Sequence, residues 1–195
     1  MERNGIEFVD VSEGDWRRLR GAWLDMVGSR CADDLETLDD ALALTEAEWR
    51  RRARELTDID CFAQALVDER GQWLGFVSGY LDELAIDRNV FITHVHVLSG
   101  QSSGLEIEDL LLDRVAQWAC ARLADGVVVG LREDRSDLVR RFEDHGFRRT
   151  GVRRRSELGR DAVEVELAMG LHALQVPRAG LAAPNGPAMR RRAMA

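Results

Sequence analysis

The segment from Leu98 to Leu112 carries residues that could bind a phosphate group. It reads Leu-Ser-Gly-Gln-Ser-Ser-Gly-Leu-Glu-Ile-Glu-Asp-Leu-Leu-Leu, which predicts a strand end, a Gly/Ser-rich loop and an amphipathic helix. At such a junction the unpaired amides and the positive end of the helix point the same way, and both favour an anion. Alternatively, the carboxylates of Glu106 and Glu108 could stabilise the positive end of this helix without any bound anion. The segment therefore predicts either an anion site or a helix end that supplies its own anions.

A second group of residues could move a proton. His94 and His96 lie two positions apart in an apolar run, so the alternation of a strand places both side chains on one face. Histidine has an ordinary pKa of about 6.5 and suits amine deprotonation through water. Glu83, beside Asp82 just after the preceding strand, is a further candidate base. The alternative interpretation is that either histidine is partly buried and hydrogen-bonded within the sheet.

Composition narrows the class of protein. The chain has 195 residues, which suits one domain with a sizeable core, and its net charge of −8 gives no reason to expect a nucleic-acid partner. There is no apolar run of transmembrane length and no signal peptide, so we expect no membrane association. Cys31, Cys61 and Cys120 are far apart and lack metal-type spacing, which predicts reduced thiols, a cytoplasmic protein and no metal site.

The hydrophobic pattern predicts the elements that position these residues. Strands are expected at 6–11, 61–68, 73–81, 91–98, 126–131, 147–152 and 162–169, with hairpin turns at 69–72 and around Gly159. Helices are expected after Asp15, from the capping box Thr45–Glu48 to about Leu56, over 107–119, and from a cap at Asp134 or Ser136 to Gly146. The order β-α-α-β-β-β-α-β-α-β-β predicts an α/β (α+β) fold, a mixed sheet flanked by helices. We expect one domain over 1–175 and a disordered Pro/Ala/Arg tail over 176–195.

Three stretches of the chain carry a resemblance to a known family. They are DWRRLRGAWL at 15–24 followed by TEAEW at 45–49, GLEIEDLLLDRVAQWA at 104–119, and LREDRSDLVRRFEDHGFRRTG at 131–151. In this order they resemble the GNAT superfamily of acyl-CoA-dependent N-acetyltransferases, and the resemblance extends over roughly residues 6–170. It implies the GNAT fold and transfer of an acetyl group from acetyl-CoA to a primary amine of a small molecule or a peptide N-terminus. Homodimers are common among such proteins.

The resemblance also implies which residues meet the cofactor. Val97 and Leu98 would flank the pantetheine arm, and Arg135 could supply positive charge for a phosphate. The loop and helix start would face the pyrophosphate with their backbone amides. The residues of this loop are Ser103, Gly104, Leu105, Glu106, Ile107 and Glu108.

Two features depart from the family's pattern. Its cofactor loop reads Q/R-x-x-G-x-G/A. Without gaps the pattern falls on Ser103, Glu106 and Glu108, and we prefer this register because it keeps Ile107 one turn before Leu111 on the core face. A second register starts at Gln101 and needs two extra residues in the helix. The general-acid tyrosine position is occupied by Phe142. Two hypotheses follow: an active N-acetyltransferase, or a catalytically degenerate binding or regulatory protein that binds acetyl-CoA weakly or not at all.

Overall fold

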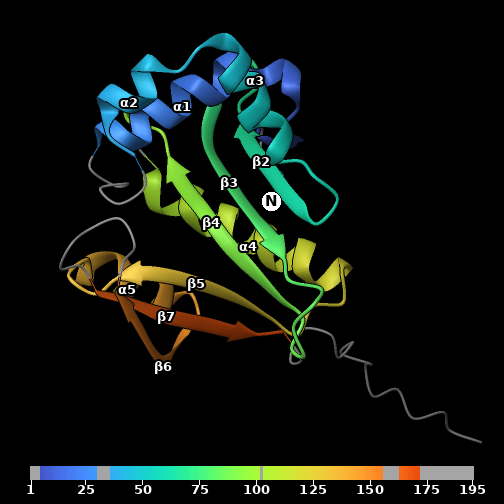
Figure 1. Cartoon of the computed structure of the whole chain (residues 1–195), viewed down its shortest axis with the longest axis vertical. Helices are drawn as coiled ribbons and strands as arrows, with labels where there is room; N and C mark the ends of the chain where they lie inside the picture. Colours follow the sequence, from blue (N-terminus) through green and yellow to red (C-terminus); the bar gives the residue numbers. More distant parts are fainter. Residues whose placement is uncertain (1–4, 30–35, 102, 156–162, 172–195) are drawn as a thin grey trace, which may run out of the picture.

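The computed structural model describes residues 5–29, 36–101, 103–155 and 163–171, and its strands form one sheet (Figure 1). The strands are β1 (Glu7–Asp10), β2 (Cys61–Val67), β3 (Trp73–Leu81), β4 (Asn89–Val97), β5 (Gly126–Arg132), β6 (Arg148–Arg155) and β7 (Val163–Gly170). The helices are η1 (Glu13–Asp15), α1 (Trp16–Gly28), α2 (Leu38–Ala43), α3 (Glu46–Glu55), α4 (Gly104–Ala121) and α5 (Ser136–Asp144). The predicted turn around Gly159 and the predicted tail at 176–195 lie outside the described residues.

The sheet opens along its middle. Its strand order is β1-β2-β3-β4-β5-β7-β6, and every neighbouring pair is antiparallel except β4 and β5. These two strands pair in parallel from Asn89↔Gly126 to Ile92↔Val129. Beyond Ile92 and Val129 they are no longer paired, and Figure 1 shows them meeting at one end and separating toward the other. In the part of the chain that the structure describes, the backbone of β4 from Thr93 onward therefore has no strand neighbour on its β5 side.

The two faces of the sheet carry different cores. On one face, α4 and α5 pack on a cluster that includes Phe62, Val77 and Leu167. On the opposite face, which we call the front face, α1 and α3 cover β2 and β3 through a cluster that includes Trp49 and Phe76. Among the described residues, this front cluster takes no buried member from β5, β6 or β7. The front face is consequently covered by helices on the β1–β4 side alone.

A β-bulge in β4 determines on which face of the sheet the side chains of His94 and His96 lie. Ser78 pairs with His94 and Gly79 pairs with Ile92, so Thr93 is an extra residue in β4. Unbroken alternation would place His94 on the face of Val90 and Ile92, which pack toward α4. The bulge moves His94 and His96 to the front face instead, where both rings lie beside Phe76 at centroid distances of 6.2 and 6.3 Å.

Several local predictions are confirmed. Thr45 and Glu48 form the predicted capping box, in which the Thr45 amide donates to Glu48 Oε2 over 2.7 Å. Gly71 has a φ of +70° in the turn after β2, and Gly146 has a φ of +105° after α5. Both positions favour glycine because other residues are strained at positive φ.

Other local predictions need correction. The polar stretch before Thr45 contains an additional helix, α2, whose start is capped by Thr37. The residue before α5 is Arg135, so neither Asp134 nor Ser136 is its N-cap. Asp15 does precede α1, but its carboxylate accepts from the Ser12 amide over 3.1 Å rather than capping that helix. Among the described residues, no helix is long and apolar enough to cross a membrane.

Candidate active site

The separation of β4 from β5 places three features side by side: an unpaired strand edge, the loop after β4 and the start of α4. Helix α4 begins at Gly104 after the N-cap residue Ser103, whose side chain makes no capping hydrogen bond. The first intrahelical bond runs from the Ile107 amide to the Ser103 carbonyl over 3.0 Å. The amides of Gly104, Leu105 and Glu106 are therefore the helix donors available to an anion.

Glu106 is the one acid in the first turn of α4, and its side chain is exposed. Among the described residues it has no hydrogen-bond or ion-pair partner, so its carboxylate does not fold back onto the loop amides. At about 4 Å a carboxylate repels a phosphate charge by roughly 1 kcal/mol in water. The helix start is thus open to an anion, at a cost in affinity of roughly fivefold.

Glu108 has a different role. Its side chain is buried, and its Oε2 lies 2.6 Å from Arg141 Nη1 on α5. Burial raises the pKa of the Glu108 carboxyl, although the charge and hydrogen bond of Arg141 oppose that shift. Arg141 donates to Glu108, so the two side chains form one ion pair that joins α4 to α5.

The start of α4 also bears on the register of the cofactor loop. In the ungapped register the pattern ends at Glu108, whose amide lies in the second turn and is used within the helix. In the other register the pattern runs from Gln101 through Gly104 to Glu106 and ends in the first turn, where amides are available. The helix boundary thus favours this second register, in which Glu106 alone replaces a glycine.

The end of β4 is tied to helix α1. Asp25 Oδ2 lies 2.7 Å from His96 Nε2 and accepts from the Ser99 amide over 2.9 Å. His96 is 5% exposed, so its ring nitrogen depends on this partner. Val97 packs toward α4, and Leu98 packs toward the front cluster. The residues expected beside the pantetheine arm therefore lie between the Asp25 contact and the start of α4.

His94 lies at the bulge where β4 leaves β5. Its Nδ1 is 2.7 Å from Ser78 Oγ and 3.1 Å from Thr93 Oγ1, and its ring lies 4.5 Å from that of Trp23. Burial and then the positive charge of Arg52 lower the pKa of His94 to about 4. The imidazole is therefore neutral at physiological pH, and it can accept a hydrogen bond but is a weak base.

The remaining candidates lie away from this point. Glu83 follows β3 in the loop before Asn89, at the closed end of the β4–β5 pair, and forms an ion pair of 3.1 Å with Arg88. Phe142 is 2% exposed and packs edge-on against Phe147 in the core, so it presents no group to the opening. Arg135 precedes α5 and lies 3.4 Å from Asp137 Oδ1.

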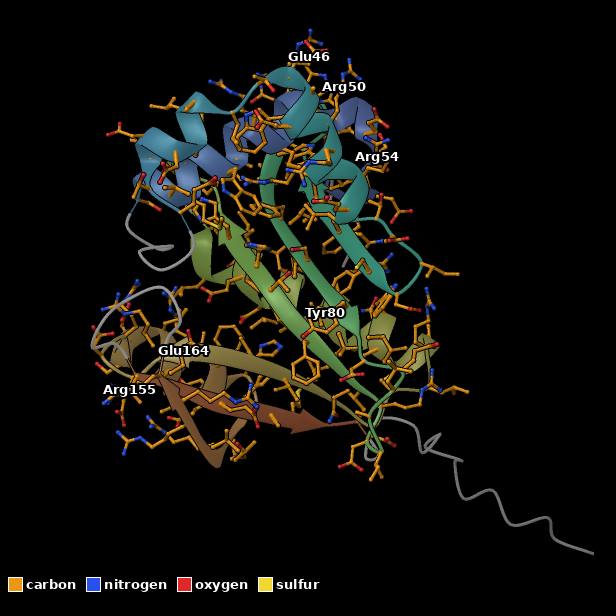
Figure 2. All side chains as sticks on the ribbon, viewed as in Figure 1. Glu46, Arg50, Arg54, Tyr80, Arg155 and Glu164 are labelled. Carbon is orange, nitrogen blue, oxygen red and sulfur yellow. The ribbon has the colours of Figure 1, made fainter. Side chains whose placement is uncertain are left out.

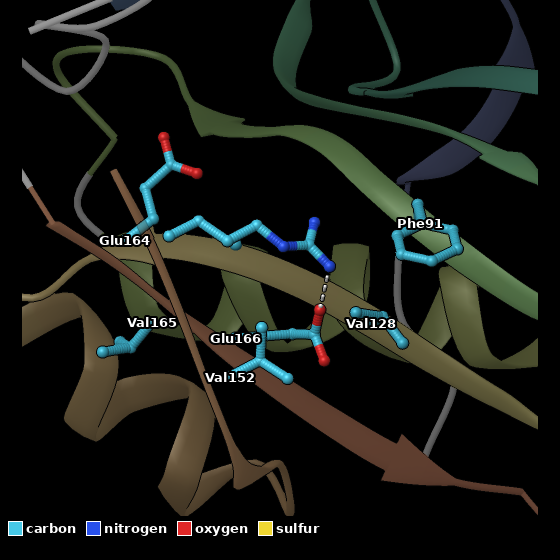
Figure 3. Close-up of a pocket in the computed structure, with 8 residues that line it drawn as sticks. Phe91, Val128, Val152, Glu164, Val165 and Glu166 are labelled. Atoms are coloured by element: carbon cyan, nitrogen blue, oxygen red, sulfur yellow. Dashed lines mark hydrogen bonds and ion pairs between the residues drawn. The ribbon is translucent and has the colours of Figure 1, made fainter. Parts of the chain in front are cut away.

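A pocket on the front face contains residues that the sequence interpretation missed (Figure 3). Phe91, Val128 and Gly130 contribute from β4 and β5. The β6–β7 side contributes Val152, Arg154, Glu164, Val165 and Glu166. The signal was available, since the alternating Val-Glu-Val-Glu run of β7 places both glutamates on one face. Tyr80, the single tyrosine of the chain, stacks on Phe91 at 5.4 Å.

These features agree with an acyl-CoA site. The unpaired edge of β4 offers backbone groups to an extended amide-containing chain, and the first turn of α4 offers amides to a pyrophosphate. A Cβ at Gly104 would meet Val97 Cγ1 at 3.9 Å, an ordinary contact, so the helix start is not crowded. The negative charge of Glu106, which has no ion-pair partner within the described ranges, is the feature that opposes the fit.

Comparison with solved structures identifies the fold. A GNAT-family acetyltransferase from Streptococcus pneumoniae superposes with a TM-score of 0.63 at 16% identity, covering 85% of this chain and 99% of that chain. The protein has the GNAT fold, as the sequence predicted. Ribosomal-protein-alanine N-acetyltransferase from Brucella melitensis gives a TM-score of 0.68 at 17% identity, covering 85% and 99% of the two chains.

A third similar structure is a NatC complex bound to Gag peptide and CoA. Its TM-score is 0.62 at 14% identity, and the match covers 86% of this chain and 99% of that chain. No protein-family model matches the sequence, and a search of curated proteins also found no match. The structural similarities establish a shared fold, and the activity has to be argued from the site.

Proposed function

We propose that the protein is an N-acetyltransferase that transfers the acetyl group of acetyl-CoA to a primary amine of a small molecule or a peptide N-terminus. The observation that carries this proposal is the opening between β4 and β5, which has the available amides of α4 at its edge and a polar and aromatic pocket on the front face. The similar structures include N-acetyltransferases and a CoA complex, which supports the choice of reaction and donor.

The donor would be held by the backbone of this chain. The amides of Gly104, Leu105 and Glu106 would bind the pyrophosphate, and the β4 edge at Val97 and Leu98 would bind the pantetheine arm. When bound, acetyl-CoA supplies the acetyl group as a thioester. The pair formed by Asp25 and His96 fixes the end of β4 from the front face and so holds the loop in register with α4.

The acceptor would approach over the front face. Its nitrogen must be neutral to attack. As the C–N bond forms and the C–S bond breaks, the nitrogen loses a proton through water and the departing CoA thiolate gains one, so that the products are the amide and the free thiol of CoA. Of the three candidate bases, His94 lies where β4 leaves β5, His96 is engaged by Asp25, and Glu83 lies at the closed end. Because the pKa of His94 is about 4, we propose that His94 orients the amine or a water through a hydrogen bond and does not itself take up the proton.

Two measurements test this function. Titration with acetyl-CoA by calorimetry should give micromolar binding, and a thiol reagent should detect CoA release when a primary amine is added. Absence of binding at millimolar acetyl-CoA, restored in Glu106→Gly, would support the degenerate alternative instead. Glu55→Gln is the matched control, because it removes one negative charge from an exposed position on α3. A cytoplasmic location stays a prediction from the sequence, and a homodimer stays an expectation from the family resemblance.

A further inference from the structure

We propose that the C-terminal segment, residues 172–195, binds to the end of the sheet beside Leu171 and covers an exposed apolar surface there. This surface consists of Ile59, Leu84, Ile86 and Leu123, and we call it the end patch. It lies at the end of the sheet where β4 and β5 are paired, opposite to the opening between these strands. The proposal therefore does not depend on the proposed acetyl-transfer function.

The end patch exposes four large aliphatic side chains to solvent. The exposed fractions are 99% for Leu84 and 101% for Ile86, and they are 79% for Ile59 and 71% for Leu123. A single exposed aliphatic side chain is ordinary in a folded protein. A group of them at one end of a domain instead indicates a surface to which another group binds.

Backbone contacts hold two parts of the end patch together. Leu84 and Ile86 lie in the loop between β3 and β4, and Leu123 lies in the turn between α4 and β5. The Arg88 amide donates to Asp125 Oδ2 over 3.0 Å, and the Asp125 amide donates to the Arg88 carbonyl oxygen over 2.8 Å. These two hydrogen bonds fix the loop against the turn.

The turn between α4 and β5 also contacts Ile59 and the last described residue, Leu171. Arg122 Nη2 donates to the Ile59 carbonyl oxygen over 3.0 Å. The Leu171 amide donates to the Asp125 carbonyl oxygen over 2.9 Å, and the Leu171 side chain is buried. Figure 1 shows the β3–β4 loop beside the end of β7. Residue 172 thus follows a residue that is fixed beside the end patch, and ten extended residues reach about 30 Å from it.

Acidic side chains surround the end patch. Residues 57–60, 82–88 and 122–125 contain six acids and two arginines. The acids are Asp58, Asp60, Asp82, Glu83, Asp87 and Asp125, and the arginines are Arg88 and Arg122. Arg88 already forms an ion pair of 3.1 Å with Glu83. The side chains of Asp60 and Asp87 have no hydrogen-bond or ion-pair partner among the described residues. This end of the molecule is therefore apolar and negatively charged.

The charge selects the occupant. A second copy of the chain would bring the same acids against one another, and an anionic lipid surface would be repelled as well. Residues 172–195 contain four arginines, three of them consecutive at 190–192, and neither Asp nor Glu. They also contain aliphatic residues, among them Leu174, Val176 and Leu181. This composition complements the end patch in both charge and hydrophobicity.

The covalent link makes a weak contact sufficient. A tethered segment has an effective concentration of about 1 mM at a site within its reach. An intrinsic dissociation constant of about 0.1 mM then gives about ten bound molecules for each free one, and covered amides exchange about tenfold more slowly. Binding of this kind orders a segment whose composition alone predicts disorder.

Hydrogen exchange of the full chain, read by mass spectrometry, tests the contact from both sides. Combining Arg190→Gln, Arg191→Gln and Arg192→Gln should speed the exchange of amides 83–87 about tenfold, because the segment then dissociates. Combining Leu84→Ser with Ile86→Ser should speed the exchange of amides 172–195 by a similar factor, because the apolar surface is lost.

The matched control removes three arginine charges elsewhere. Arg18→Gln, Arg50→Gln and Arg51→Gln each break an exposed ion pair on α1 or α3. Figure 2 shows Arg50 at the far end of the molecule from Tyr80, which lies next to the last residue of β3. The control should leave the exchange of amides 83–87 at the wild-type rate.

Three outcomes would overturn the proposal. The first is wild-type exchange of the reporting amides in either test variant. The second is equal acceleration in the control, which would assign the effect to net charge alone. The third is protection of amides 83–87 that rises with protein concentration while sedimentation shows a dimer, because a second copy would then cover the end patch. Thermal unfolding of each variant verifies that the fold is retained.

Discussion

His96 Nε2 lies 2.7 Å from Asp25 Oδ2, and this contact joins helix α1 to the end of β4. The same oxygen accepts from the Ser99 amide at the start of the loop that leads to α4. Burial tends to raise the pKa of Asp25, but the hydrogen bonds from His96 and Ser99 outweigh it and lower the pKa below its ordinary value. The acid is therefore ionised at physiological pH and fixes both a buried ring and the loop backbone.

Replacing Asp25 should weaken acetyl-CoA binding although the residue belongs to the opposite face of the sheet. Asp25→Ala removes the acceptor of both hydrogen bonds, and we expect a loss of affinity of about tenfold because the loop must then be ordered on binding. Asp25→Asn keeps one oxygen, and its affinity for acetyl-CoA should lie between those of the wild type and Asp25→Ala. Calorimetric titration gives the affinities, with Glu55→Ala as the exposed control; equal affinity in Asp25→Ala would contradict the link.

Removing the charge of Glu106 should strengthen acetyl-CoA binding. The side chain is exposed and stands in the first turn of α4, so its repulsion of a phosphate is screened by solvent. We expect Glu106→Gln to improve the dissociation constant about fivefold at low salt, and we expect the gain to shrink as ionic strength rises. Glu55→Gln should leave the affinity unchanged at every salt concentration. A salt-independent gain would assign the effect to something other than charge.

His94 should affect stability with pH more than it affects the rate. Its folded-state pKa of about 4 lies below the unfolded value of 6.5, so the unfolded chain binds more protons between these values. The free energy of unfolding should thus fall as pH drops from 6.5 to 4, by up to roughly 3 kcal/mol. Denaturant titrations should find this loss removed in His94→Gln. An inflection near pH 6.5 in kcat/KM that disappears in the same variant would contradict the neutral role.

The sequence predicted the order of the strands and principal helices along the chain because each of these elements has a strong local signal. The capping box at Thr45 and the apolar face of α4 need no tertiary information. The short helix α2 had a signal as well, since the Thr37 side chain accepts from the Asp40 amide, but a polar stretch obscured it.

What the sequence could not predict depends on contacts between distant elements. Alternation placed His94 and His96 together but could not choose the face, because the bulge at Thr93 depends on pairing with β3. Gly79 marks that bulge, since a Cβ there would meet the Phe91 carbonyl oxygen at 2.4 Å. The partner of Glu108 lies 33 positions away on α5, so the sequence alone suggested a phosphate-facing acid where the fold places a buried ion pair.

The ion pair of Glu108 with Arg141 predicts a stability that decreases as pH rises, which is opposite to the effect expected of His94. The folded-state pKa of Glu108 is raised above its ordinary value of 4.5, so the folded protein binds more protons than the unfolded chain just above that pH. The contribution of Glu108 to stability is therefore present below pH 4.5 and decreases as pH rises through the folded-state value. Glu108→Gln should abolish this decrease while keeping a hydrogen bond to Arg141.

Arg141→Met should extend the decrease to higher pH, because it removes the charge that holds the pKa of Glu108 down. It should also destabilise the protein by about 3 kcal/mol at neutral pH, since a buried carboxylate then lacks its partner. The double variant Glu108→Gln with Arg141→Met should recover most of that loss. Denaturant titrations between pH 4 and 8 measure all three proteins. Equal pH dependence in Arg141→Met and the wild type would mean that the two side chains are not coupled in solution.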